Sequence, residues 1–229
     1  MNQTVTHELY SPTYAAAYGG LYVDHPQWRS KNATNLAVVR SLLRPGSAWL
    51  DVCCGQAWHR TQLPPLYRYV GLDGSAAQLA RARAAAPGGE FVKCDVRAFE
   101  FDPPRRFSLV TSFFAAYAYL ESETEILGLV RKMARWTRPS GSLYLEVIHP
   151  QWLLAFNDTA FARETEARVI ARSEDCVRWD YVDPGGHHTM LSPHPDRFVD
   201  VLARSFRDVD TRGSVAGMVQ LVARGRLDD

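Results

Sequence analysis

The stretch Ala48-Trp49-Leu50-Asp51-Val52-Cys53-Cys54-Gly55 decides the fold of this chain. It is a short, nearly continuous apolar run that leads into a glycine, the pattern of a strand buried on both faces of a parallel sheet. Similar runs occur at residues 67–73, 91–94, 107–113 and 142–148. We interpret these runs as the strands of one central sheet.

Helical patterns separate the predicted strands. Residues 35–43 place apolar side chains on one helical face, residues 75–86 are rich in alanine and follow the N-cap Ser75, and residues 121–136 are amphipathic. They end at Arg44-Pro45-Gly46, Pro87-Gly88-Gly89 and Pro139-Ser140-Gly141. Strands that alternate with helices form right-handed crossovers, so we predict a doubly wound α/β fold with a mostly parallel sheet.

The pattern changes at both ends of this unit. Residues 168–171 and 176–182 alternate polar and apolar side chains, which predicts an antiparallel hairpin or lid. A helix over residues 195–206 and a final strand over residues 217–224 follow. We predict a cover segment at residues 1–34 and a main domain at residues 35–229, with a lid insertion at about residues 151–192.

The cover segment is aromatic, with tyrosines spaced so that one helical face would carry them all. Packing against a core is the ordinary interpretation, and a mobile cover over a ligand is the other. The tyrosines are Tyr10, Tyr14, Tyr18 and Tyr22.

Composition excludes several classes of protein. The chain has 229 residues, of which 46% are hydrophobic and 22% charged, as in ordinary globular proteins. Its net charge of +1 gives no field that would attract nucleic acid or an anionic membrane. It has no apolar run long enough for a membrane span and no signal-like start, so we expect a cytoplasmic protein. The four cysteines include no C-x-x-C pair, and His187, His188 and His194 lack supporting carboxylate spacing, so we expect no metal.

Acidic residues stand where three predicted strands end, the edge at which open α/β sheets bind ligands. Asp73 is suited to accept hydrogen bonds from a ribose diol, while Asp95 and the Val96 amide could address an adenine edge. Gly55 permits close approach of a ligand to the backbone, with the small Cys53 nearby. Asp51 could instead stabilise its own loop, and Asp95 could be a helix N-cap. The dinucleotide fingerprint G-x-G-x-x-G fails, because Cys53 and Trp58 occupy its outer glycine positions.

These segments resemble the Rossmann-like (class I) S-adenosylmethionine-dependent methyltransferase family. The resemblance covers residues 35–148 well, and its motifs lie at residues 49–57, 70–75, 93–96, 107–113 and 139–145. It implies a seven-stranded sheet with an antiparallel last strand, and S-adenosylmethionine as the cofactor. Ala57 stands where the family usually has glycine, Gln56 where Thr or Ser is common, and Ser108 where an acidic residue is common.

The resemblance also implies the site. Catalysis would consist mainly of holding an acceptor atom in line with a sulfonium methyl group, with S-adenosylhomocysteine as the product. The expected cofactor-binding residues are Tyr18, Asp51, Cys53, Gly55, Asp73, Gly74, Asp95, Val96 and Phe113. The expected acceptor-binding residues are Tyr14, Trp28, Tyr117, Trp152 and His187.

His149, directly after the fifth strand, is the candidate general base, although a strand-end turn is its ordinary interpretation. His187 could likewise be no more than part of a surface loop.

We therefore predict methyl transfer to an O or N atom, less so a C atom, of a small-molecule acceptor. Two alternatives stay open. The fold could use the sulfonium only as a positive charge in a cyclisation or rearrangement, or the altered Gln56-Ala57 loop could make the chain a non-catalytic binding module. The sequence leaves the oligomeric state open.

Overall fold

A seven-stranded sheet forms the centre of the molecule in a computed structural model that describes residues 10–102, 104–175, 177–215 and 217–227. Its strand order is β3-β2-β1-β4-β5-β10-β9. Only β10 runs antiparallel to its neighbours, β5 and β9, among the described strands of this sheet. The predicted doubly wound, mostly parallel sheet is confirmed, and the strand order reverses between β1 and β4. The strands are β1 (Ala48–Val52), β2 (Arg68–Asp73), β3 (Glu90–Lys93), β4 (Phe107–Ser112), β5 (Thr137–Ile148), β9 (Phe206–Val215) and β10 (Met218–Arg226).

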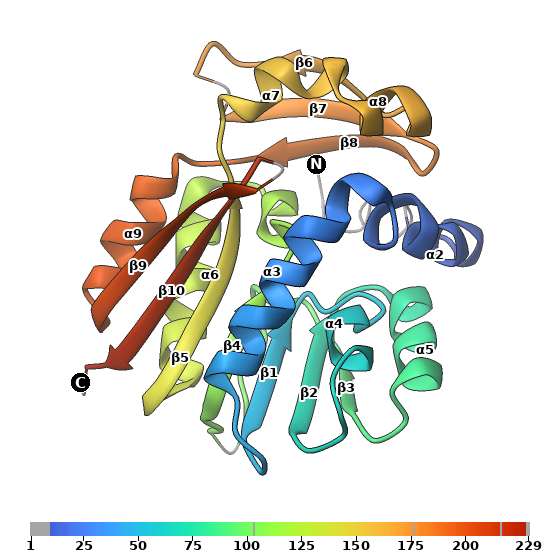
Figure 1. Cartoon of the computed structure of the whole chain (residues 1–229). Coiled ribbons are helices and arrows are strands. Elements are labelled where there is room, and N and C mark those ends of the chain that lie inside the picture. The colour runs from blue at the N-terminus through green and yellow to red at the C-terminus, as the bar shows by residue number, and fades with distance from the viewer. Residues whose placement is uncertain (1–9, 103, 176, 216, 228–229) are drawn as a thin grey trace.

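Helices cover both faces of this sheet (Figure 1). Successive side chains of a strand point to opposite faces, so β1 divides its apolar residues between two cores. Leu50 and Val52 pack on the face covered by α6 (Glu123–Trp136) and α9 (Pro195–Ala203). Trp49 packs on the other face, which α3 (Pro26–Leu42), α4 (Trp58–Thr61) and α5 (Ala76–Ala85) cover. Both faces of β1 are therefore buried, as its apolar run predicts.

A smaller antiparallel sheet lies above the carboxyl ends of the central strands (Figure 1). We call it the lid sheet; its strands are β6 (Arg168–Arg172), β7 (Arg178–Asp183) and β8 (Gly186–Leu191). Three short helices, α7 (Trp152–Ala155), η3 (Phe156–Asp158) and α8 (Ala160–Thr165), lead into it from β5. The predicted lid insertion after the fifth strand is confirmed.

The aromatic N-terminal segment lies between the lid sheet and the central sheet (Figure 1). It forms α2 (Pro12–Tyr18) and the π-helical turn η1 (Gly19–Val23), which we call the cover helices. Ser11 caps α2 by accepting a hydrogen bond from the Tyr14 amide. The first nine residues of the expected cover segment lie outside the described part of the chain, and the boundary expected between residues 34 and 35 falls inside α3.

Several predicted boundaries were wrong for identifiable reasons. The helix expected at residues 35–43 begins at Pro26, because the buried Lys31 and Asn32 interrupt the apolar pattern that marks its inner face. We expected Pro139-Ser140-Gly141 to form a turn after the preceding helix. The segment instead lies inside β5, where the register with β4 shifts. Gly141 fits there because a Cβ atom would press against backbone carbonyl oxygens of two neighbouring segments.

Two strands were not predicted. β8 contains His187 and His188, which the sequence placed in a turn or surface loop. The strand was missed because its hydrogen bonds come from pairing with β7, which sequence periodicity does not reveal. The helix expected at residues 195–206 ends at Ala203, and Phe206 instead begins β9, the polar edge strand. Edge strands tolerate such polar residues because only one side is paired.

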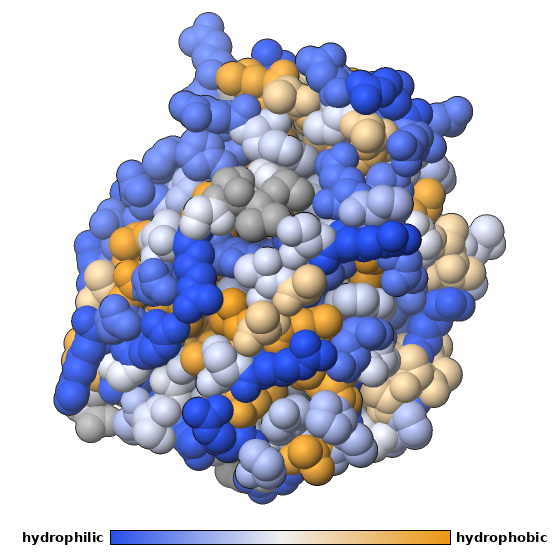
Figure 2. Space-filling model, in the orientation of Figure 1, coloured by the Kyte–Doolittle hydropathy of each residue, from blue (hydrophilic) through white to orange (hydrophobic). Residues whose placement is uncertain are grey.

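The described helices include none with the length and apolarity needed to cross a bilayer. On the face drawn in Figure 2, hydrophilic residues dominate and hydrophobic residues form small, separated groups. The buried hydrophobic residues of the described segments form two core clusters.

A buried ion pair joins α3 to the central sheet. Lys31 Nζ lies 3.2 and 3.1 Å from the two carboxylate oxygens of Glu146 in β5, and both side chains are completely inaccessible. The ammonium group also lies 3.4 Å from the centre of the Phe114 ring, and Glu146 accepts the Phe114 amide hydrogen at 2.8 Å. Burial lowers the pKa of Lys31 in spite of Glu146. These contacts fix the loop after β4, in which Phe114 has a positive φ of 54°.

Replacing Lys31 by Met should lower the free energy of unfolding by about 3–5 kcal/mol, because it leaves a buried carboxylate without its partner. Urea denaturation measures this change. Arg105→Ala is the matched control, since Arg105 pairs with Glu90 at the exposed surface and its loss should cost less than about 1 kcal/mol. The double variant Lys31→Met/Glu146→Leu should recover most of the stability. Equal losses in Lys31→Met and Arg105→Ala would contradict this account.

Candidate functional site

A cavity of about 220 Å³ lies between the carboxyl ends of the central strands and the lid sheet. Its strand end is formed by loops that follow β1, β2 and β3. Its lid end is formed by the cover helices, the loop after β4, the helices after β5 and the lid strands β7 and β8. Residues at the strand end are Cys53, Cys54, Gly55, Gln56, Asp73, Gly74, Ser75, Gln78, Cys94 and Val96. Aromatic residues in the lining are Tyr10, Tyr14, Tyr18, Tyr22, Trp28, Trp58, Phe113, Phe114, Tyr117, Tyr119, Trp152, Phe156, Phe161, Trp179 and Tyr181.

Asp73 organises the strand end. One of its carboxylate oxygens accepts the Gly55 amide hydrogen at 2.8 Å, and the other accepts the Ser75 amide hydrogen at 2.8 Å. The Ser75 side chain in turn caps α5 by accepting from the Gln78 amide. A carboxylate at the tip of β2 is thus held in the cavity wall by the two loops that flank it.

The loop after β1 turns in left-handed steps at alternate residues. Cys53, Gly55 and Ala57 have φ values of 58°, 53° and 55°. Glycine adopts this conformation freely, whereas a residue with a Cβ atom adopts it at a cost of about 1 kcal/mol. The loop keeps this shape with glycine at only the middle position.

Asp51 does not line the cavity, although the sequence placed it beside the ligand. Its carboxylate is buried in the core between Tyr69 Oη at 2.9 Å and Thr111 Oγ1 at 2.8 Å. Trp49 Nε1 donates to the same Thr111 hydroxyl at 2.9 Å. Burial raises the pKa of Asp51 to about 7, against the two hydroxyl donors that lower it. Asp51 therefore connects β1, β2 and β4 inside the sheet.

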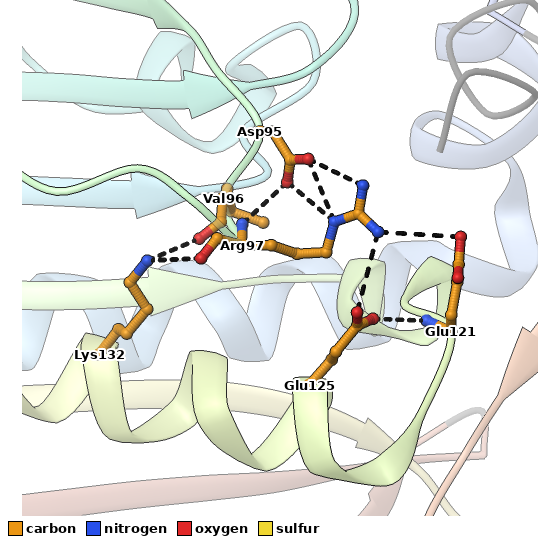
Figure 3. Close-up of polar contacts among 6 residues, drawn as sticks. All are labelled: Asp95, Val96, Arg97, Glu121, Glu125 and Lys132. Atoms are coloured by element: carbon orange, nitrogen blue, oxygen red, sulfur yellow. Dashed lines mark hydrogen bonds and ion pairs between the residues drawn. The ribbon is translucent and has the colours of Figure 1, made fainter. Parts of the chain in front are cut away.

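Asp95 also lies outside the cavity lining and is engaged by its own loop (Figure 3). Its carboxylate accepts the Arg97 amide at 2.9 Å and pairs with the Arg97 guanidinium at 2.8–3.1 Å. Arg97 continues to Glu121 and Glu125 near the start of α6, at 3.8 Å each. Lys132 of α6 donates to the carbonyl oxygens of Val96 and Arg97. The Val96 side chain, by contrast, does line the cavity.

Two buried polar atoms in the lining have no hydrogen-bond partner within the described residues. They are Gln78 Oε1 near the strand end and Trp28 Nε1, and both side chains are almost inaccessible. Buried polar atoms are nearly always paired, so these two are suited to an acceptor and a donor contact with a ligand.

A carboxylate joins the cover helices to the lid sheet at the other end. Asp183, the last residue of β7, accepts the hydroxyls of Tyr14 at 2.5 Å and Tyr181 at 2.9 Å, and also that of Tyr22. Its other oxygen accepts the Gly185 amide at 2.7 Å. Gly185 permits the contact with α2, because a Cβ atom there would overlap the Tyr14 ring.

Tyr18 lies between the two ends of the cavity. Burial raises its pKa, as do Tyr119, Asp73 and Asp183 in that order. One continuous lining includes Tyr18 together with residues of both ends, so the strand end and the lid end belong to one cavity. The tyrosine row of the sequence is thus a cavity wall as well as part of the packing.

Comparison with known proteins agrees with this architecture. Residues 50–141 match the family described as a methyltransferase domain. The dTDP-4-amino-2,3,4,6-tetradeoxy-D-glucose N,N-dimethyltransferase of Saccharopolyspora spinosa is 28% identical over 198 residues, covering 79% of this chain and 77% of that protein. The matched segment is thus similar to a methyltransferase domain, and the fold is the one that Rossmann-like (class I) methyltransferases have.

Two solved structures share the fold. DesVI of Streptomyces venezuelae is 23% identical, with 92% of this chain and 98% of that chain covered and a TM-score of 0.64. CalS10 bound to S-adenosylmethionine, an amino pentose methyltransferase from Micromonospora echinaspora, is 21% identical, with 94% and 98% covered and a TM-score of 0.64.

The departures of this chain from the first motif of the family it resembles have a structural explanation. Gln56 donates through its side-chain amide to the carbonyl oxygen of Ala15 in α2, which ties the loop after β1 to the cover helices. Ala57 is completely buried with a positive φ, and its methyl group is accommodated in the core beside Phe113 and Tyr144.

Most of the expected site residues line the cavity, and four do not. His149 lies outside the lining at the end of β5, where its Nδ1 accepts the Gln151 amide at 3.3 Å and its ring approaches His194. His187 points outward on β8 with a half-exposed side chain, 3.6 Å from Asp180. The other two are Asp51, which is buried in the core, and Asp95, which is paired with Arg97. His149 is therefore not among the residues that line this cavity.

Sequence reasoning missed several residues of the lining. Ser75 and Gln78 follow Asp73 in the first turn of α5, so topology alone could have indicated them. His59 could not be found in this way, because it reaches the cavity by stacking on Phe113 at 3.7 Å between ring centres. Burial lowers the pKa of His59, and Lys31 lowers it further, so the ring is neutral.

The elevated pKa of Asp51 makes a prediction about stability. The folded protein holds this proton up to about pH 7, whereas the unfolded chain releases it near its ordinary pKa of 3.8. The stability of the wild type should therefore fall relative to Asp51→Asn as the pH rises from about 4 to 7, by at most about 1.4 kcal/mol per pH unit. Chemical unfolding of both proteins across this range measures the difference. Parallel stability curves would show that Asp51 is ionised in the folded protein throughout.

Proposed function

We propose that this methyltransferase transfers the methyl group of S-adenosylmethionine to an amino nitrogen of a small, sugar-type acceptor. The observation that carries the proposal is Asp73, a carboxylate held at the tip of β2 in the wall of a cavity that continues to an aromatic lid end. An open α/β sheet binds its ligand at this edge, next to the point where the strand order reverses.

The strand end fits the nucleoside part of S-adenosylmethionine. Asp73 offers oxygen acceptors for a ribose diol, and the positive φ values of Cys53 and Gly55 bend the β1 loop around the space beside it. Gln78 Oε1 supplies a further acceptor that the protein leaves unpartnered. Val96 and Cys94 provide apolar contact for a flat base at the tip of β3.

The lid end fits a small acceptor with polar groups. Its aromatic walls exclude water, while the Tyr119 side chain and the unpartnered Trp28 Nε1 offer polar contacts. Nitrogen is favoured over oxygen as the acceptor atom because the named substrates of two similar proteins, from Saccharopolyspora spinosa and Micromonospora echinaspora, are amino sugars.

The protein contributes to the reaction mainly by positioning the methyl donor and the acceptor. S-adenosylmethionine, when bound, supplies a methyl group on a positively charged sulfur. The aromatic rings of Tyr18 and Phe113 line the space in which that charge would lie, and aromatic faces attract cations. The cover helices and lid sheet hold the acceptor in one orientation and keep water out, which accounts for much of the rate gain in a displacement of this type.

Asp73→Asn should weaken the binding of S-adenosylmethionine about 10- to 100-fold, because the negative charge is lost and only one of the two loop amides keeps an acceptor oxygen. Isothermal calorimetry measures the affinity. Glu90→Gln is the matched control, since Glu90 is exposed at the amino end of neighbouring β3 and should leave binding unchanged. Wild-type affinity in Asp73→Asn, or no binding by the wild type, would refute the proposed donor site.

Mass spectrometry tests the reaction itself. We expect S-adenosylhomocysteine to form in step with a methylated amine when dTDP-4-amino-2,3,4,6-tetradeoxy-D-glucose is offered, and little product from its 4-hydroxy counterpart. A rearranged acceptor without S-adenosylhomocysteine would indicate the cyclase alternative. Tight donor binding without turnover of any acceptor would indicate the binding module.

A further inference from the structure

A continuous row of polar groups leads away from the cavity at its lid end. Tyr119, the last residue of η2 (Ala116–Tyr119), lines the cavity, and its Oη lies 3.0 Å from His188 Nδ1. The other ring nitrogen of His188, Nε2, lies 3.0 Å from Asp183 Oδ1. The His188 and Asp183 side chains are 0% and 1% exposed. A tyrosine of the cavity lining is thus connected through its hydroxyl to a buried imidazole and a buried carboxylate.

The carboxylate determines the direction of these hydrogen bonds. Asp183 accepts three tyrosine hydroxyls and the Gly185 amide in addition to His188. Burial raises the pKa of Asp183, but the hydrogen bonds from His188, Tyr14 and Tyr181 outweigh it and hold the pKa below its usual value. An ionised carboxylate keeps a proton on Nε2 of His188. The Nδ1 lone pair is then free to accept the Tyr119 hydroxyl.

The Tyr119 hydroxyl is itself protonated. Burial raises the pKa of Tyr119, while a hydrogen bond from Tyr10 opposes the shift. Tyr119 can therefore pass its own proton to His188 while its oxygen takes one from a group in the cavity. The three side chains have the arrangement of a base oriented by a third residue, with a hydroxyl at the reactive end.

We propose that Tyr119, His188 and Asp183 form a proton relay that receives the proton of the acceptor amine during methyl transfer. This inference rests on the proposed function. The amine lone pair forms the new nitrogen–carbon bond, the carbon–sulfur bond breaks, and its electron pair stays on sulfur. The nitrogen–hydrogen proton passes to Tyr119 Oη as the Tyr119 proton passes to His188 Nδ1. The imidazolium formed is balanced by the Asp183 carboxylate.

Tyr119 is the catalytic residue in this scheme, and His188 and Asp183 are positioning residues that act through it. Groups from several elements face His188 and influence its protonation. They are Asp183 and Tyr181 from β7, Tyr14 from α2 and Tyr119 from η2.

The test uses Tyr119→Phe and His188→Gln in the full chain. Tyr119→Phe removes the proton donor, and His188→Gln can still hydrogen-bond with Asp183 but cannot take up a proton. We expect both to bind S-adenosylmethionine like the wild type in calorimetry, and to turn over dTDP-4-amino-2,3,4,6-tetradeoxy-D-glucose about 100-fold more slowly or worse. Tyr67→Phe is the matched control, because Tyr67 precedes β2 at the far end of the sheet.

The pH profile separates the relay from a structural role. The wild-type pH profile of turnover should combine a contribution from the relay with one from protonation of the amine. His188→Gln should lose the first contribution and keep the second. A purely structural role would lower turnover in both variants at every pH without changing the shape of the profile, and would overturn the relay.

A second measurement does not require turnover. In protein with ¹⁵N-labelled histidine, His188 should show a protonated Nε2 and an unprotonated Nδ1 at neutral pH. The Nδ1 resonance should shift in Tyr119→Phe and stay in place in Tyr67→Phe. The opposite tautomer would overturn the relay.

The outcomes for the two proposals differ. Near wild-type turnover in Tyr119→Phe and His188→Gln would overturn the relay and leave the proposed function intact. A wild type that binds S-adenosylmethionine but methylates no amine would overturn both.

Discussion

The lid end of the cavity depends on one buried carboxylate, Asp183. The cover helices and the lid sheet are far apart in the sequence, and each is too small to bury a core of its own. Asp183 accepts hydroxyls from Tyr14 and Tyr22 on the cover helices and from Tyr181 on its own strand. A charge buried without such partners would cost several kcal/mol, so the carboxylate requires the cover helices to stay in place.

A second buried charge fixes the opposite wall. Lys31 and Glu146 hold α3 against β5, and both contact Phe114 in the loop after β4. That loop continues to Tyr119, so its position is determined by an ion pair on one side and by His188 on the other. A buried carboxylate and a buried ion pair, with partners that come from the protein, thus position the elements that line the cavity.

The acidic residues at the strand tips have separate tasks that their similar positions do not reveal. Asp73 faces the cavity and organises the loops on both sides of it. Asp51 is turned into the core between two hydroxyls, and Asp95 is paired with Arg97. In the register of β1 with β2, Asp51 is level with Gly71, so Asp73 lies two residues nearer the carboxyl edge of the sheet, where ligands bind, while Asp51 stays inside the sheet.

The sequence by itself determined the doubly wound sheet, the lid insertion and the strand end of the site. Apolar runs, helix caps and loop glycines are local signals, and parallel strands necessarily bring their carboxyl ends to one edge. Cys53, Gly55, Asp73 and Val96 were therefore placed at the cavity from their positions alone.

Only the tertiary structure decided which residues form the lid end of the cavity and where the histidine side chains lie. His149 follows a central strand but lies outside the cavity, whereas His188, next to the outward-facing His187, is buried against Asp183. Neighbouring residues on a strand face opposite sides, and which side meets the cavity depends on how the lid sheet packs. That packing comes from long-range contacts among tyrosines, Asp183 and the loop after β4, which no local pattern records.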